Sequence, residues 1–310
     1  MLSRRNIRIK VMQMLYTMSR DKELTYKEAL SRYDNGIEES YVLFLFNLNY
    51  LVKVARYSLK DADRRLAKHL PTEEDKTFTP KIFNNETVQS IATHVGFNDI
   101  VEKLKFEESV DQDTVRKVYV SFSKTPEYQA YLDKECTEKD DRDMLLSLFK
   151  HCINHELFNE AIEDRYATWV DDKSLVIGTI KKTIKGLPEQ KDFVKIYKPT
   201  EETTKEFGEA LFENVIEQNK ELLEIIEPAL NNWDADRVAI IDMILLKMAL
   251  SEFMIFPSIP TKVTLNEFVE ISKMYSTDKS KDFINGILDR LMKVLKKDGR
   301  ITKEGRGLVE

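Results

Sequence analysis

The side chains with the clearest chemical meaning lie at the start of the chain. Arg4, Arg5, Arg8 and Lys10 follow one another closely, and residues 1–20 contain no acidic side chain. Guanidinium and ammonium groups gathered in this way pair with anions. Cations in the first turn of a helix oppose the helix dipole, at a cost of about 0.3–1 kcal/mol each when exposed. We therefore infer that something other than helix stability keeps these arginines there.

A helix over 4–19 is predicted to position these cations. Ser3 is a residue type that caps helix starts, and apolar side chains recur after it at the spacing of one buried helical stripe. The arginines are predicted along one flank of that stripe, and Tyr16 continues the flank with an aromatic ring. The predicted buried stripe consists of Ile7, Val11, Met14, Leu15 and Met18.

The composition bounds the class of protein. The chain has 310 residues, of which 42% are apolar and 33% charged, with nine glycines and eight prolines. These values predict a soluble, mostly helical protein with room for roughly two or three domains. The formal net charge of −6 argues against polyanion binding by the protein as a whole. The basic start of the chain is therefore a local feature.

Two further features bear on localisation. The chain has only two cysteines, Cys136 and Cys152, and it shows no apolar leader. Both features predict a reduced, cytoplasmic compartment. The longest strongly apolar run, 238–250, is interrupted by Asp242 and Lys247 and is too short to cross a bilayer. No membrane segment is expected.

Helical periodicity extends over nearly the whole chain, and no stretch shows sustained strand alternation. The polar segment 70–86, which contains two prolines, is the predicted linker, and a second break falls at 186–209. The predicted divisions are an N-terminal helical subdomain (1–70), a helical insertion (71–200) and a C-terminal helical subdomain (201–310). Helices are predicted at 4–19, 25–33, 38–70, 85–95, 98–106, 111–122, 126–135, 138–165, 172–186, 203–227, 234–255, 264–275 and 280–298.

Other patterns that could do chemistry are weak. His151 and His155, four residues apart with Glu156 adjacent, have a spacing that can hold a metal ion, but no third ligand with clear spacing appears. The chain has no glycine-rich phosphate loop, dinucleotide-binding motif or serine-hydrolase elbow. We therefore expect no metal site, no cofactor and no catalytic residue.

The most specific pattern lies in the last third of the chain. It consists of Trp233, Arg237, Ile241, Asp242, Ile244, Leu245, Ala249, Glu252, Pro260, Asn266, Glu267, Lys273, Phe283, Ile284, Asn285, Gly286, Leu288 and Asp289. The opening stretch "RRNIRIKVMQMLY" adds an arginine-rich helix that ends in a Leu-Tyr pair. In both respects the chain resembles the NusB family of bacterial transcription antitermination factors, over 3–20 and 204–300.

The resemblance implies an all-α fold, a NusB-like bundle of two packed helical subdomains, here with the additional helical insertion at 71–200. It implies RNA binding rather than catalysis. Family members pair with NusE, a ribosomal small-subunit protein, to hold the single-stranded boxA element of nascent ribosomal RNA in an antitermination complex with RNA polymerase. The alternative is a non-catalytic helical scaffold for protein–protein interaction that has lost RNA binding.

The resemblance assigns RNA binding to an open edge of the first helix and to the loop before the last helix. Cations neutralise phosphates there, and aromatic rings stack on bases at about 1–3 kcal/mol per base. Three of these features have a simpler alternative: Tyr275 could close the core at a helix end, Lys279 could be a solvated loop charge, and the Arg4/Arg5/Arg8 cluster could be a solvated helix face. The side chains implied to bind RNA are Arg4, Arg5, Arg8, Lys10, Tyr16, Tyr275 and Lys279.

Two acids, Asp242 and Glu252, are implied to lie at the surface that faces NusE. Asp242 could equally be a buried acid paired with Lys247 or Arg237.

Two scaffold features are also expected in the last third. Thr264 with Glu267 has the spacing of a capping box that starts a helix after Pro260. Gly286 lies inside a strong helical pattern, where glycine costs about 1 kcal/mol against alanine, so a neighbouring helix is expected to approach it closely.

Overall fold

The computed structural model describes residues 2–190, 192–230 and 235–308. Within these ranges every regular element is a helix and none is a strand, which confirms the predicted all-α class. No helix in the described ranges is long and apolar enough to cross a bilayer. The chain forms two compact units: the middle unit (Glu38–Lys198) and the terminal unit (Leu2–Ile37 with Pro199–Glu310).

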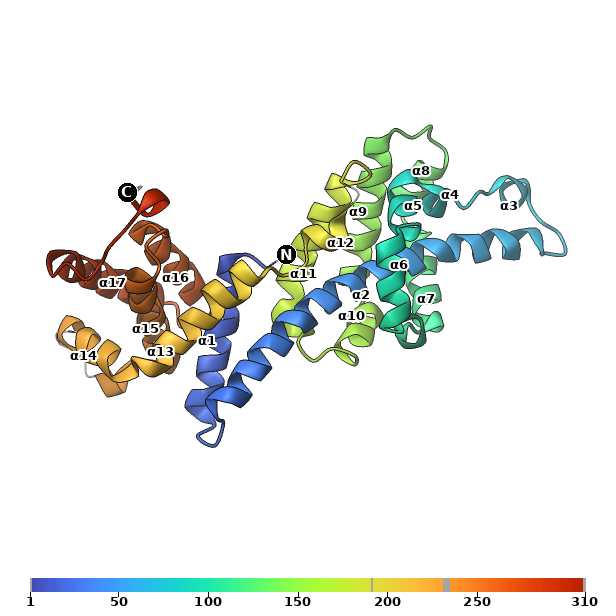
Figure 1. Cartoon of the computed structure of the whole chain (residues 1–310). Coiled ribbons are helices and arrows are strands. Elements are labelled where there is room, and N and C mark those ends of the chain that lie inside the picture. Colours follow the sequence, from blue (N-terminus) through green and yellow to red (C-terminus); the bar gives the residue numbers. More distant parts are fainter. Residues whose placement is uncertain (1, 191, 231–234, 309–310) are drawn as a thin grey trace. The chain divides into compact units, whose positions relative to one another are not determined.

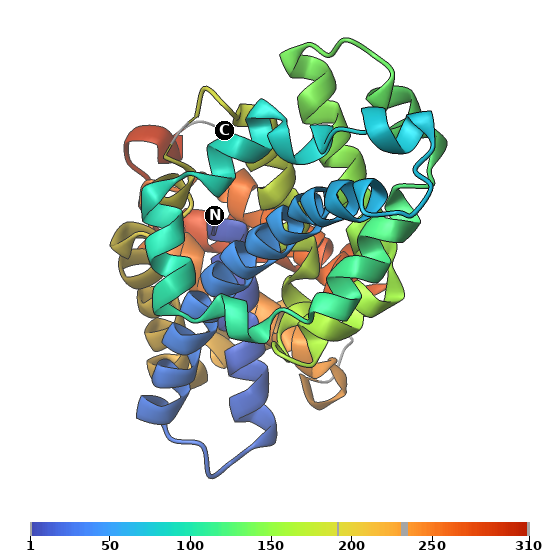
Figure 2. The same cartoon turned by 90° about the vertical axis from the view of Figure 1, so that its right-hand side faces the viewer.

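The terminal unit combines the start of the chain with its last third. α1 (Arg4–Arg20) turns back through 21–25 into α2 (Tyr26–Leu66), whose first part lies beside α1 in this unit (Figures 1 and 2). The later elements are a π-helical segment η2 (Glu202–Glu209), α13 (Ala210–Glu217), α14 (Asn219–Leu230), η3 (Ala235–Arg237), α15 (Ile240–Ile255), α16 (Thr261–Tyr275), α17 (Ser280–Lys297) and η4 (Gly305–Leu308).

α15 is the central helix of the terminal unit. Its sequence is apolar on almost every side, which is the pattern of a helix enclosed by neighbours. α1, α13, α14, α16 and α17 all pack against it, and Figure 1 shows α16 and α17 next to it. Groups that reach α15 are therefore removed from solvent unless they lie near its ends.

The first helix begins where the sequence predicts. The Ser3 side chain accepts the backbone N–H of Asn6, and the Asn6 side chain accepts the backbone N–H of Ser3 at 3.2 Å, which makes a capping box. Met14 and Met18 are only half-buried, so the buried stripe differs from the predicted one. The buried residues of α1 are Ile7, Arg8, Val11, Met12 and Leu15.

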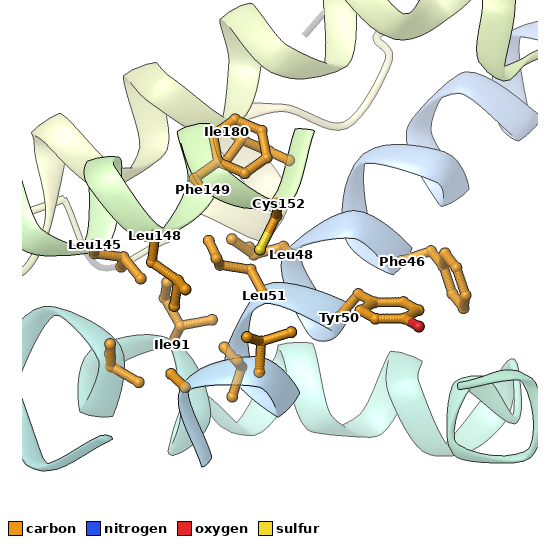
Figure 3. Close-up of a cluster of buried hydrophobic side chains, with 14 of the residues drawn as sticks. Phe46, Leu48, Tyr50, Leu51, Ile91, Leu145, Leu148, Phe149, Cys152 and Ile180 are labelled. Atoms are coloured by element: carbon orange, nitrogen blue, oxygen red, sulfur yellow. The ribbon is translucent and has the colours of Figure 1, made fainter. Parts of the chain in front are cut away.

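The middle unit is built around the second part of α2. Figure 3 shows Leu48 and Leu51 of α2 meeting Ile91, Cys152 and Ile180 from three other helices in one apolar core. The remaining described elements of this unit are α3 (Glu73–Thr77), α4 (Lys81–Asn84), α5 (Glu86–Ala92), α6 (Val95–Lys103), η1 (Phe106–Ser109), α7 (Gln112–Phe122), α8 (Pro126–Leu132), α9 (Glu138–Asn154), α10 (Glu156–Glu163), α11 (Trp169–Gly186) and α12 (Phe193–Ile196).

The predicted linker at 70–86 contains ordered structure. Thr72 caps α3, and the ammonium of Lys68 donates to both carboxylate oxygens of Asp75 at 2.7 and 2.8 Å. The segment lies inside the middle unit rather than between units. The division into 1–70, 71–200 and 201–310 stays a prediction, because the two compact units do not show which residues are inserted.

Several predicted helix boundaries differ from the structure. The helices expected at 25–33 and 38–70 are one continuous helix, α2, in which Gly36 has no heavy atom within 4 Å of the place a Cβ would take. One glycine costs about 1 kcal/mol in a helix. It does not end the helix when the residues before it and after it are packed. The helix expected at 138–165 is divided at His155 into α9 and α10.

Both scaffold expectations for the last third are wrong. α16 begins at Thr261, so Thr264 is inside the helix, and it donates its hydroxyl to Glu252 at 2.7 Å instead of capping. A Cβ built on Gly286 would meet no heavy atom within 4 Å, so no neighbouring helix approaches it closely. Trp233, part of the family pattern, lies outside the described residues.

Candidate functional site

A basic groove lies at the start of α1 in the terminal unit. Its volume is about 670 Å³, and its walls come from α1, the loop after α15, α16 and η4. Arginines outnumber acids along these walls, so the groove is lined mainly by cationic side chains. The groove is lined by Ser3, Arg4, Arg5, Arg8, Ser258, Ile259, Pro260, Val263, Glu267 and Arg306.

Arg8 lies at the base of the groove and is closed off from solvent. Its guanidinium donates two hydrogen bonds to Glu252, at 2.7 and 2.6 Å, and the two side chains are 3% and 0% exposed. Glu252 also accepts the hydroxyl of Thr264, so the buried carboxylate is well satisfied. The expectation that Arg8 belongs to an open flank of the helix is therefore wrong: this guanidinium stabilises the packing of α1 on α15.

Arg5 faces Glu267 across the groove. Its Nε and Nη2 each donate to that carboxylate at 2.7 Å, and the side chains are 45% and 20% exposed. The hydrogen bonds from Arg5 hold the pKa of Glu267 below its usual value, against the opposing effect of burial, and the charge of Arg8 adds to the lowering. Arg5 thus reaches solvent but already has an internal partner.

Arg4 has the weakest internal contact of the three arginines. Its Nη2 lies 3.4 Å from an oxygen of Glu202, and the two side chains are 41% and 69% exposed. Exposed pairs of this kind are worth about 0–1 kcal/mol. The guanidinium also lies 5.6 Å from the ring centre of Phe207. Arg4 can therefore turn toward a ligand at small cost.

The π-helical segment η2 holds Phe207 beneath both Arg4 and Arg8. The guanidinium of Arg8 lies 5.1 Å from the Phe207 ring centre. The neighbouring Gly208 is packed so tightly that a Cβ there would lie 1.8 Å from the Tyr33 hydroxyl and 2.6 Å from Ile7. That close approach fixes the distance between η2 and α1.

Arg306 is a groove residue that the sequence analysis missed. It lies in η4, well after the last predicted helix, and its side chain is exposed. No motif or periodicity marks it, because its position depends on how the segment after α17 folds back onto the loop after α15. The only signal in the sequence was its charge.

The other residues predicted to bind RNA lie outside the groove. Lys10 is half-buried, and Tyr16, further along α1, is 39% exposed. Tyr275 is the half-buried last residue of α16, and Lys279 is exposed immediately before α17.

The arginines and the loop before α17 lie near opposite ends of α15. Arg8 pairs with Glu252, and Ser280, the first residue after that loop, donates its hydroxyl to Asp242 at 2.8 Å. Glu252 follows Asp242 by ten positions, which corresponds to about 15 Å along a helix. The edge of the first helix and the loop before the last helix, both assigned to RNA by the resemblance, are therefore not gathered at one place.

The two acids expected to face NusE are buried. Asp242 is 5% exposed, and its Oδ1 has no hydrogen-bond partner among the described residues. It is not paired with Lys247, which donates to Asn219 at 2.7 Å, or with Arg237, whose side chain is exposed. Glu252 is 0% exposed. Both side chains make internal contacts, which corrects the expectation of an open partner surface at these positions.

His151 and His155 belong to the middle unit. His151 Nε2 lies 2.7 Å from the hydroxyl of Ser121, and burial lowers the His151 pKa, with His155 adding to the effect. Within the described ranges, no three His, Cys, Asp or Glu side chains are arranged to hold a metal ion.

The described regular elements of the terminal unit are all helices, and an arginine-rich groove lies at the start of its first helix. A family model described as the NusB family matches residues 177–293. The chain is also similar to curated proteins with the name "Transcription antitermination protein NusB". The one from Salinibacter ruber is 42% identical over 107 residues, which are 34% of this chain and 67% of that protein. The chain belongs to the NusB family.

Two further relatives with the same name match shorter shares of their own length. The protein from Chloroherpeton thalassium is 41% identical over 106 residues, 34% of this chain and 50% of the relative. The one from Natranaerobius thermophilus is 46% identical over 74 residues, 24% of this chain and 53% of the relative. No solved structure matches the chain significantly. The family model does not include α1, which the structure joins to the matched region through Arg8 and Glu252.

Proposed function

We propose that this chain is a transcription antitermination factor that binds single-stranded, boxA-like RNA together with the ribosomal protein NusE, as part of an RNA polymerase antitermination complex. Membership of the NusB family supports this role, and we propose no catalytic activity. The observation that carries the RNA part is the groove at the start of α1, where the partly exposed guanidinium groups of Arg4 and Arg5 gather.

The chemistry of the groove suits a phosphodiester. Arginine binds phosphate through two parallel hydrogen bonds, and the N–H groups of a helix start add positive charge in the same direction. Arg4 would give up only a weak, exposed contact with Glu202. Further along the helix, the exposed ring of Tyr16 is available to stack on a base.

A second candidate, the non-catalytic helical scaffold, is favoured by a specific observation. Arg8 is fully engaged by Glu252, and Arg5 makes two hydrogen bonds to Glu267. If these internal ion pairs persist in the presence of RNA, the arginines serve the packing of α1, and the groove has no nucleic-acid ligand.

Salt-dependent binding separates the two candidates. We expect Arg4→Ala/Arg5→Ala to weaken binding of a boxA-like single-stranded RNA. The plot of log association constant against log salt concentration should become shallower by about 1.4, at about 0.7 per phosphate contact. Binding is measured at several salt concentrations, with and without NusE. Arg8 is left intact because its loss would destabilise the unit rather than test the ligand.

The matched control is Lys293→Ala/Lys297→Ala, which removes the same charge from exposed positions of α17 outside the groove. An equal loss of affinity in both double variants would indicate a general charge effect. Unchanged affinity and slope in the arginine variant would favour the scaffold.

A further inference from the structure

The segment 303–307, which follows α17, folds back on the loop that follows α15, and we call it the strap. The ammonium of Lys303 donates to the backbone carbonyl of Phe256 at 2.8 Å, and the backbone N–H of Glu304 donates to that of Pro257 at 3.0 Å. Successive residues of the strap are thus bonded to successive residues of the loop. The same loop supplies Ser258 to the wall of the basic groove.

Two glycines are required for this arrangement. Gly305 has a φ of +52°, in the left-handed region that L side chains rarely adopt. Gly307 lies so close to the loop that a Cβ there would be 1.9 Å from the carbonyl oxygen of Pro257. Arg306 lies between them, so the backbone conformations of the two glycines set the direction in which its side chain leaves the strap.

Arg306 reaches the groove without an acid to neutralise it. It is exposed and lines the groove, and it forms no ion pair with any carboxylate that the structure describes. The acid of the groove, Glu267, is already engaged by Arg5 and lies 3.6 Å from Arg8. Holding a further cation beside arginines is unfavourable unless an anion joins them.

We propose that Arg306 binds a phosphate of the single-stranded RNA backbone, and that the strap 303–307 is the device that positions it opposite Arg4 and Arg5. The proposal rests on the RNA binding proposed above and extends it. The phosphate site has two walls, one from the start of α1 and one from a segment that lies outside the region matched by the family model. A strand held between both walls meets cations from two sides.

The experiment compares RNA affinity across a series of salt concentrations for wild type and variants. We expect Arg306→Ala to weaken binding of a boxA-like single-stranded RNA by about five-fold at low salt, and to lower the salt slope by about 0.7, as for one lost phosphate contact. Lys297→Ala is the matched control, because it removes one exposed positive charge from the same unit outside the groove. It should leave the slope nearly unchanged.

Gly307→Ala tests the positioning role of the strap. Its Cβ cannot coexist with the docked carbonyl of Pro257, so the variant should release Arg306 and lose as much affinity as Arg306→Ala. In the double variant Arg306→Ala/Gly307→Ala the glycine change should have no additional effect on RNA binding, since its only consequence for RNA is the loss of Arg306. Thermal unfolding of each variant confirms that the unit remains folded.

The outcomes distinguish this inference from the proposed function. If wild type binds RNA and Arg4→Ala/Arg5→Ala weakens it, but Arg306→Ala matches wild type in affinity and slope, the inference is overturned and the proposed function stands. If Arg306→Ala weakens binding and Gly307→Ala does not, the positioning role of the strap is overturned. Absence of wild-type binding at every salt concentration, with and without NusE, would overturn the proposed function itself.

Discussion

The open groove and the buried network beneath it use the same residue type in opposite ways. In the groove, Arg4 touches Glu202 at 3.4 Å with both side chains exposed. One helical turn further, Arg8 is 3% exposed and makes two short hydrogen bonds to a carboxylate that is fully buried. Solvent screens the exposed Arg4–Glu202 pair but does not reach the buried Arg8–Glu252 pair. Four residues along one helix therefore separate a cation that can serve a ligand from one that holds the fold together.

Arginine density alone therefore does not define a nucleic-acid surface. A buried guanidinium is retained because its removal would leave an uncompensated charge, whereas an exposed one gains little from its internal partner. Arg5 is intermediate, since it is 45% exposed and still bonded twice to Glu267. Ligand binding and stability should consequently respond to different members of the same cluster.

The largest expected effect is the loss of the buried pair. Arg8→Ala leaves Glu252 buried without its counter-charge and should lower the free energy of unfolding by about 3–5 kcal/mol. Arg4→Ala, which removes an exposed contact, should change it by less than about 1 kcal/mol. Denaturant unfolding of both variants measures the contrast, and equal effects would contradict it. The double variant Arg8→Met/Glu252→Leu should recover much of the loss, because apolar packing replaces both charges.

A smaller effect is expected where η2 packs on α1. Gly208→Ala places a methyl group against Tyr33 and Ile7, and overpacking of this kind costs about 1–3 kcal/mol. Gly286→Ala is the matched control, since the same methyl group meets nothing within 4 Å in α17 and should stabilise the helix by up to about 1 kcal/mol. Opposite shifts of the thermal midpoint are expected. If both variants shift the midpoint in the same direction, the close approach at Gly208 is not tight.

The smallest effect concerns the intermediate pair and its dependence on pH. Because Arg5 lowers the pKa of Glu267 below the ordinary value of 4.5, the pair stabilises the folded state above that value. The contribution is lost as pH falls through the lowered pKa. The difference in unfolding free energy between wild type and Glu267→Gln should therefore be constant near neutral pH and shrink below about pH 4.

Unfolding measured between pH 7 and pH 3 checks this expectation. Glu270→Gln is the control, because it changes an acid of the same helix whose ion pair, with Lys273, lies within α16. A difference between wild type and Glu267→Gln that stays constant down to pH 3 would show that the Arg5 contact contributes nothing through charge.

Much of the local structure of the site could be predicted from the sequence. Ser3 begins α1 as expected, and the amphipathic pattern gives the extent of the helix to within one residue. The side of the helix that is buried was less well predicted. At about 100° per residue, Arg8 falls between Leu15 and Met12, both of which are buried. A stripe centred on those two residues, rather than on Met14 and Met18, would have placed Arg8 inside.

The contacts made with distant segments could not be predicted. Glu252 is 244 residues away from Arg8, and nothing in the spacing of either helix indicates that they meet. The capping box predicted from Thr264 and Glu267 does not form, because α16 begins earlier and both side chains face partners on other helices. Contacts of this kind override local sequence patterns when the distant side chain compensates a buried charge.

Residue types at short, regular spacings were enough to predict the helical class, the start of the first helix and the family. Which arginines are open, and that Arg306 lies in the same groove, follows only from the way the chain folds. Whether a guanidinium can be buried depends on a carboxylate meeting it there. Folding supplies that carboxylate from a distant part of the chain.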